Sequence, residues 1–134
     1  MGWVDIRTTL AQSHDAVRER LSGIIRELAA ADREFRADIE FIEDRPVVGI
    51  TKDEPIARTC AEAFRDLTAR EPVWNGVPGA TDGTFLSAWK RIPCLVNGPG
   101  PRHIPHQVDE YVEIGQVVEC ARVYALSAFR FLDL

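Results

Sequence analysis

Residues 79–114 of this chain read GATDGTFLSAWKRIPCLVNGPGPRHIPHQVDEYVEI. The stretch begins with a glycine-rich loop, continues through a short helical segment (84–90) and reaches the apolar run IPCLV (92–96), which is typical of a strand buried within a sheet. It then turns through GPGPRHIPH (98–106). Loops at the ends of strands are where α/β proteins bind ligands, so the stretch predicts an α/β fold with a candidate site at these two loops.

The N-terminal third is expected to form a strand, a helix and a second strand. WVDIRTT (3–9) and FRADIEFIE (35–43) both alternate apolar and polar side chains, as half-buried strands do. Between them Ser13 is a suitable N-cap for a helix over residues 15–32. The apolar positions expected to form its core face are Val17, Leu21, Ile24, Ile25 and Leu28. These elements predict a β-α-β unit within residues 1–50.

Residues 51–134 are expected to form a second unit. Pro55 marks the first turn of a helix. Its predicted buried stripe comprises Ile56, Cys60, Ala63, Phe64 and Leu67. A last helix covers residues 117–129 and has so little polar face that it is predicted to be well buried. The cysteines are odd in number and set among apolar neighbours, so buried reduced thiols are expected at Cys60, Cys94 and Cys120.

Composition argues against several classes of protein. The chain has 134 residues, the size of one ordinary domain, with 46% hydrophobic and 28% charged residues, which is a soluble globular balance. A net charge of -5 without a basic stripe argues against nucleic-acid binding. No secretory leader is evident, and no run approaches the roughly 18 apolar residues of a spanning helix, so a cytoplasmic location without membrane association is expected.

Two of the three histidines lie in the second loop. His106 is the better candidate metal ligand, because Asp109 and Glu110 follow within about one helical turn and can support an imidazole ligand. His103 is interpreted as a loop residue. His14, in the first turn of the first helix, is expected to be solvated. From the residues alone, a single loop histidine is more often incidental than a ligand, so both interpretations stay open.

These motifs in combination resemble the zinc-dependent aminoacylase and carboxypeptidase family, which includes acetylornithine deacetylase, succinyl-diaminopimelate desuccinylase and glutamate carboxypeptidase. In that family a glycine-rich loop, a short helix, an apolar strand and Gly-Pro-Gly precede a histidine and an acidic pair, in the order seen in residues 79–114. WVDIRTTLAQSHDAVRERL (3–21) resembles part of the family's lid or dimerisation domain. The resemblance implies half of a ferredoxin-like lid at residues 1–50, followed at 51–134 by the C-terminal part of a zinc-peptidase-like α/β domain.

The resemblance also implies roles for individual residues. His106 matches the histidine that binds one of two zinc ions, for which Co²⁺ or Mn²⁺ are possible substitutes. Asp82 would cap the helix that follows it. The residues that would contact the substrate are Arg7, Ala80, Thr81 and Arg102, with Arg7 holding the substrate carboxylate. The turn that delivers His106 would be formed by Gly98, Pro99 and Gly100.

The implied activity is hydrolysis of the amide bond of an N-acyl amino acid or small peptide, by a metal-bridging water that a glutamate deprotonates. The sequence contains no His-x-Asp and no Glu-Glu, the motifs that carry other ligands and the general base in the family. The chain is therefore expected to be a C-terminal fragment or subunit that is inactive alone. It would form a homodimer or join a complementing N-terminal chain. The alternative is a non-catalytic dimerisation or interaction module that keeps the fold.

Overall fold

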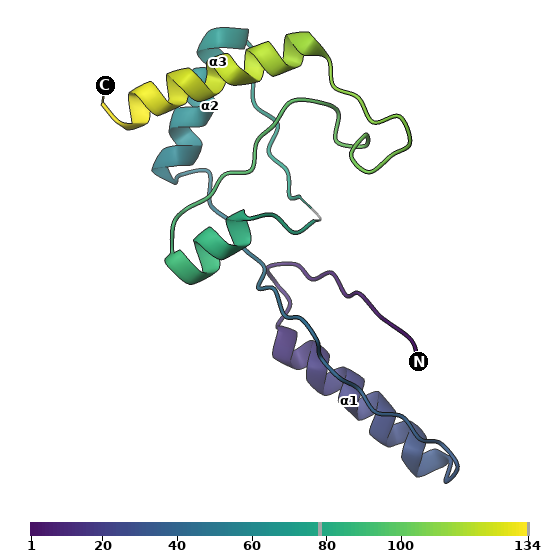
Figure 1. Ribbon diagram of the computed structural model, residues 1–134. Helices are drawn as coiled ribbons and strands as arrows, with labels where there is room; N and C mark the ends of the chain where they lie inside the picture. The colour runs from purple at the N-terminus through teal and green to yellow at the C-terminus, as the bar shows by residue number, and fades with distance from the viewer. Residues whose placement is uncertain (78, 134) are drawn as a thin grey trace.

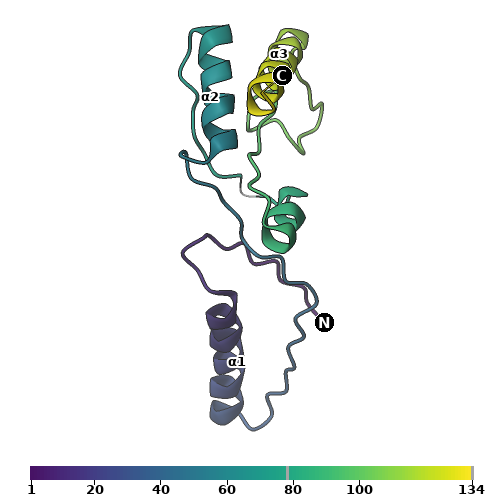
Figure 2. The same cartoon turned by 90° about the vertical axis from the view of Figure 1, so that its left-hand side faces the viewer.

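The computed structural model describes residues 1–77 and 79–133. Within these residues it has three α-helices and one short π-helix: α1 (His14–Ala31), α2 (Pro55–Thr68), η1 (Phe85–Trp89) and α3 (Ile114–Phe131). α2 and α3 lie together at one end of the molecule, α1 extends away at the other end, and η1 lies between them (Figure 1, Figure 2). The helices therefore separate an N-terminal arm from a small helical core.

The predicted helix near residue 15 is confirmed as α1. Ser13 occupies the N-cap with extended backbone, and its hydroxyl accepts a hydrogen bond from the amide of Ala16 at 3.3 Å. The prediction of a core face on this helix is wrong, since none of its residues is buried and Leu28 remains 46% exposed. The reason is that α1 packs against no other helix of the described chain.

The three predicted strands are absent from the described residues. Segments 3–9, 35–43 and 92–96 are extended or irregular there, without the paired hydrogen bonds that define a strand. Segment 35–43 runs back along α1 instead, as Figure 1 and Figure 2 show. An extended segment becomes a strand only where another backbone satisfies its N–H and C=O groups. The α/β sheet and the ferredoxin-like half-lid therefore stay predictions.

The core lies where α2 packs on α3. Pro55 occupies the first turn of α2, where its fixed φ suits the helix. The side chains of Ala63 and Val123 are almost fully buried, and Cys60 is 8% exposed beside them. Half-buried apolar side chains complete the cluster: Phe64, Leu95 and Leu126. The small residues on α2 let α3 approach closely, and the core is the set of contacts between these two helices.

Two predicted burial patterns are wrong. Leu67 is 44% exposed although it belongs to the expected stripe of α2. Within residues 117–129 only Val123 and Ser127 are buried, because α3 packs on one neighbour rather than within a layer. Of the three free cysteines, Cys60 is buried, and Cys94 and Cys120 are half-buried. None of the helices in the described ranges is long and apolar enough to cross a bilayer.

Candidate functional site

The loop GPGPRHIPH is anchored at the start of α3. The Gly100 amide donates a hydrogen bond to the side-chain oxygen of Gln116 at 2.9 Å. Gly100 has a φ of 98°, a left-handed conformation that glycine adopts without the steric cost a side chain would bring. Gly98 and Pro99 precede it on the surface. Gly100 therefore fixes this part of the loop to the start of α3, and a turn that delivers His106 to a metal stays a prediction.

His106 is exposed at the far end of this loop and has a φ of 66°. Its backbone amide donates to the Glu110 carboxylate at 3.0 Å, so Glu110 supports the loop backbone. No three His, Cys, Asp or Glu side chains converge as a possible metal cluster within residues 1–77 and 79–133. The residues present do not by themselves fit a zinc site, and the ligand role of His106 stays a prediction. His103 is likewise exposed.

A hydrogen bond joins the second predicted loop to the segment that precedes the first. The Arg102 guanidinium donates to the carbonyl oxygen of Gly76 at 2.7 Å, just ahead of the GATDG loop. In that loop Ala80 is exposed and Thr81 is half-buried. The carbonyl of Asp82 accepts the amides of Phe85 at 3.0 Å and Leu86 at 3.3 Å. The N-cap of η1 is Thr84, without a side-chain cap hydrogen bond, so a capping role for the Asp82 side chain stays a prediction. The structure therefore bonds Arg102 to Gly76, three residues before the GATDG loop, and the predicted substrate contacts of Arg102 and of this loop stay predictions.

Arg7 has a different environment from these loops. Its Nε and Nη2 atoms both donate to one oxygen of Asp5, at 3.0 and 2.7 Å. Both side chains are largely exposed, and surface pairs of this kind contribute at most about 1 kcal/mol to stability. The Arg7 guanidinium is therefore engaged by a neighbour in its own segment, and its predicted contact with a substrate carboxylate is untested.

A second polar cluster forms where the N-terminal segment, α1 and the segment after α1 meet. His14 Nδ1 is hydrogen-bonded to Oδ1 of Asp44, and His14 Nε2 lies 2.7 Å from the hydroxyl oxygen of Thr8. Arg18 donates to Oδ2 of Asp44 at 2.5 Å, and its guanidinium lies 5.3 Å from the centre of the Phe41 ring. The prediction that His14 is solvated is wrong, because the ring is half-buried and bonded through both nitrogens.

Helix geometry explains half of this cluster. His14 and Arg18 are four residues apart, so they project from the same face of α1. The returning segment brings Asp44 against both of them. The hydrogen bond from His14 lowers the pKa of Asp44 below its usual value, and the charge of Arg18 also lowers it, against the opposing effect of desolvation. Asp44 is therefore ionised at neutral pH.

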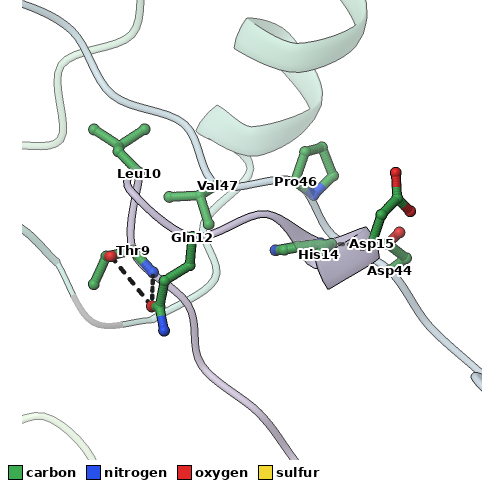
Figure 3. Close-up of a pocket in the computed structure, with 8 residues that line it drawn as sticks. All are labelled: Thr9, Leu10, Gln12, His14, Asp15, Asp44, Pro46 and Val47. Carbon is green, nitrogen blue, oxygen red and sulfur yellow. Dashed lines mark hydrogen bonds and ion pairs between the residues drawn. The ribbon is translucent and has the colours of Figure 1, made fainter. Parts of the chain in front are cut away.

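His14 and Asp44 line a pocket of about 390 Å³. Its lining is mixed: Figure 3 shows the apolar side chains of Leu10, Pro46 and Val47, the polar ones of Thr9 and Gln12, and the carboxylates of Asp15 and Asp44 near His14. The volume falls in the range of small-molecule sites. The pocket was missed from the sequence because its walls come from two segments about 30 residues apart. The four-residue spacing of His14 and Arg18 was the one feature of the sequence that pointed to a polar cluster on this face of α1.

A second pocket, of about 370 Å³, opens on the helical core and is lined by residues of α2 and α3 with Leu95 and Asn97. The Tyr124 hydroxyl donates to the carbonyl oxygen of Asn97 at 2.5 Å. Desolvation, with a further contribution from a hydrogen bond to Cys120, raises the pKa of Tyr124 to about 12. The phenol therefore stays protonated at neutral pH and holds the segment after IPCLV against α3.

The chain belongs to the peptidase family M20/M25/M40, which it matches over residues 3–130. This confirms the resemblance to the aminoacylase and carboxypeptidase family. The chain is 26% identical over 133 residues to N-formyl-4-amino-5-aminomethyl-2-methylpyrimidine deformylase of Bacillus subtilis (strain 168), covering 90% of this chain and 31% of that protein. It is 30% identical over 128 residues to acetylornithine deacetylase of Myxococcus xanthus, covering 96% of this chain and 32% of that protein.

The chain thus spans about a third of the length of these curated relatives. No solved structure matches it.

Proposed function

We propose that this chain is the C-terminal fragment or a subunit of a zinc-dependent amidohydrolase that acts on N-acyl amino acids or small peptides. The observation that carries the proposal is the family match over residues 3–130, which includes the Gly-Pro-Gly turn, His106 and the acidic pair after it. The names of the two relatives describe the removal of a formyl and of an acetyl group. Both names are consistent with a deacylase origin.

In this proposal the chain contributes one metal ligand, His106, and part of the substrate pocket. The proposed pocket residues are Arg7, Ala80, Thr81 and Arg102. The Arg102 bond to Gly76 supports a pocket built from both loops. The donor set within the described residues is incomplete, so the remaining ligands are proposed to come from a complementing N-terminal chain or a longer polypeptide. In that assembly segments 3–9 and 35–43 would form strands of the ferredoxin-like lid.

A second candidate function is a non-catalytic dimerisation module derived from the same family. The uncovered apolar face of α1 favours it, because a face of this kind is a common site of association between proteins. In this alternative His106 has no metal to bind.

The ligand role of His106 is tested by titrating the chain with Zn²⁺ and following the histidine ring signals by nuclear magnetic resonance. The His106 signals are expected to shift first, and His106→Ala should remove most of the binding. His103→Ala is the matched control in the same loop and should leave the binding unchanged. Affinity should be far weaker than the roughly 10–16 kcal/mol of closed structural zinc sites. A tight stoichiometric site in the chain alone, or loss of binding in His103→Ala only, would overturn the assignment.

A chimera separates the two candidate functions. Residues 3–130 replace the aligned segment of the Myxococcus xanthus acetylornithine deacetylase, and folding is checked by circular dichroism. The amidohydrolase proposal expects the folded chimera to deacetylate acetylornithine and expects His106→Ala to abolish that activity. A folded but inactive chimera would favour the non-catalytic module.

A further inference from the structure

Thr8, His14 and Asp44 are arranged as a nucleophile, a base and an orienting carboxylate. The Thr8 hydroxyl and the Asp44 carboxylate are bonded to opposite nitrogens of one imidazole ring. This is the connectivity that activates a hydroxyl for attack on a carbonyl carbon in unrelated hydrolases. None of the three residues has a part in the proposed amidohydrolase site.

With His14 in its neutral form, one tautomer satisfies both hydrogen bonds. An ionised carboxylate only accepts hydrogen bonds, so the Nδ1 atom of His14 carries the proton that faces Asp44. In the neutral imidazole Nε2 is then an acceptor, and the Thr8 hydroxyl must donate to it across 2.7 Å. Arg18 holds the other carboxylate oxygen at 2.5 Å, which fixes the orientation of Asp44. In this tautomer the Thr8 proton is directed at a base.

Thr8 is not among the residues that line the pocket, but its neighbour Thr9 and its partners His14 and Asp44 are, so the pocket lies beside the three residues. Its volume of about 390 Å³ and its apolar side chains, Leu10, Pro46 and Val47, suit a short acyl group. The carboxylates of Asp15 and Asp44 disfavour an anionic substrate. His14 and Asp15 form the first turn of α1. The positive end of the helix dipole therefore lies at the pocket, where it partly offsets the charge of these carboxylates.

We propose that Thr8, His14 and Asp44 form an acyl-transfer site for small neutral or cationic carboxylic esters. The Thr8 oxygen attacks the ester carbonyl carbon while its proton passes to Nε2 of His14. The bond from the carbonyl carbon to the leaving oxygen breaks, and the departing alcohol takes the proton from His14. Water then attacks the Thr8 ester with His14 as base, and the released Thr8 oxygen regains a proton, which yields the free acid. Asp44 acts as a positioning residue that keeps the imidazole oriented.

The probe is p-nitrophenyl acetate, with a metal chelator present so that the outcome is independent of the proposed zinc site. The wild-type chain is expected to release p-nitrophenol and to carry an acetyl group on Thr8 in peptide mass spectra. Thr8→Val and His14→Gln should each lower the rate at least tenfold, since general base catalysis contributes roughly 10²- to 10⁴-fold. Thr8→Ser should retain activity. Thr51→Val and His103→Gln, matched changes at exposed positions elsewhere, should leave the rate unchanged.

Three outcomes would overturn the proposal. The first is a rate that Thr8→Val leaves intact, because the nucleophile would then be another group such as the imidazole itself. The second is an acetyl group found only on lysines or the N-terminus. The third is a variant series in which His14→Gln and His103→Gln behave alike, since any exposed imidazole would then explain the rate. An ester with a carboxylate in its acyl group should react more slowly in the wild type, and a faster reaction would contradict the predicted pocket charge.

Discussion

The exposed apolar face of α1 predicts that the chain associates with itself, and that Leu28→Ala weakens the association. The accessible surface is 10,972 Å², whereas a compact monomer of 15.0 kDa exposes about 7,000 Å². The excess of about 3,900 Å² is several times the roughly 800 Å² that each partner buries in a standard interface. Enough surface is therefore open for a stable interface, and α1 carries part of it.

The size of the effect follows from the exposure of Leu28, which is 46%. Complete burial of a leucine side chain contributes about 1.5–3 kcal/mol, so burial of the exposed remainder contributes about 1 kcal/mol. Both chains of a symmetric dimer carry the substitution, so Leu28→Ala should remove about 2 kcal/mol and raise the dissociation constant about thirtyfold. Leu28→Glu should raise it further, because association would desolvate a carboxylate.

Sedimentation velocity over a range of concentrations measures this change directly. Arg26→Ala is the control, since Arg26 is exposed and lies on nearly the opposite side of the same helix. It should leave the dissociation constant unchanged. A wild-type chain that stays monomeric at all concentrations, or equal effects from both alanine substitutions, would refute the role of this face.

Two further predictions concern the helical core. Val123→Ala should lower the free energy of unfolding by about 1–3 kcal/mol, because Val123 is 1% exposed. The control Val117→Ala changes a 43% exposed side chain and should stay within about 0.5 kcal/mol of the wild type. Urea unfolding followed by circular dichroism compares the two variants. The folded-state pKa of Tyr124, about 12, exceeds the roughly 10 of an unfolded tyrosine. The stability that the protonated Tyr124 phenol contributes to the fold is thus fully present below pH 10 and is lost as the pH rises towards 12. Tyr124→Phe should remove that part of the alkaline loss of stability, and an unchanged pH profile would contradict the assignment.

The helices were predictable because their signals are local. Ser13 and Pro55 mark the starts of α1 and α2 within a few residues of the observed boundaries. The strand predictions for 3–9 and 35–43 rested on alternation, which indicates a half-buried surface but not what covers it. In the structure Phe41 meets Arg18 of α1 instead of a neighbouring strand. Burial on α3 failed as a prediction for the same reason, since hydrophobic periodicity does not tell how many neighbours a helix has.

The candidate sites differ in what sequence can reveal about them. The left-handed conformation of Gly100 agrees with a glycine turn in residues 98–100, because it depends on local backbone conformation, whereas the exposure of His106 was not predicted. The environment of His14 depends on Asp44, which lies 30 residues away and reaches it only after the chain reverses direction. Helix spacing alone could pair His14 with Arg18 but not with a carboxylate from another segment.

The number of chain segments that a site requires decides which chemistry the chain can perform alone. A zinc site needs several side chains to converge, and the described residues bring no such group together around His106. A nucleophile, a base and a carboxylate need only one returning segment, and α1 with the residues on either side of it supplies all three. The proposed zinc-dependent reaction would therefore require other segments of protein, whereas the proposed acyl transfer at Thr8 would not. Ester turnover that persists in chelator, together with amide hydrolysis that appears only when further ligands are supplied, is the pattern that this division predicts.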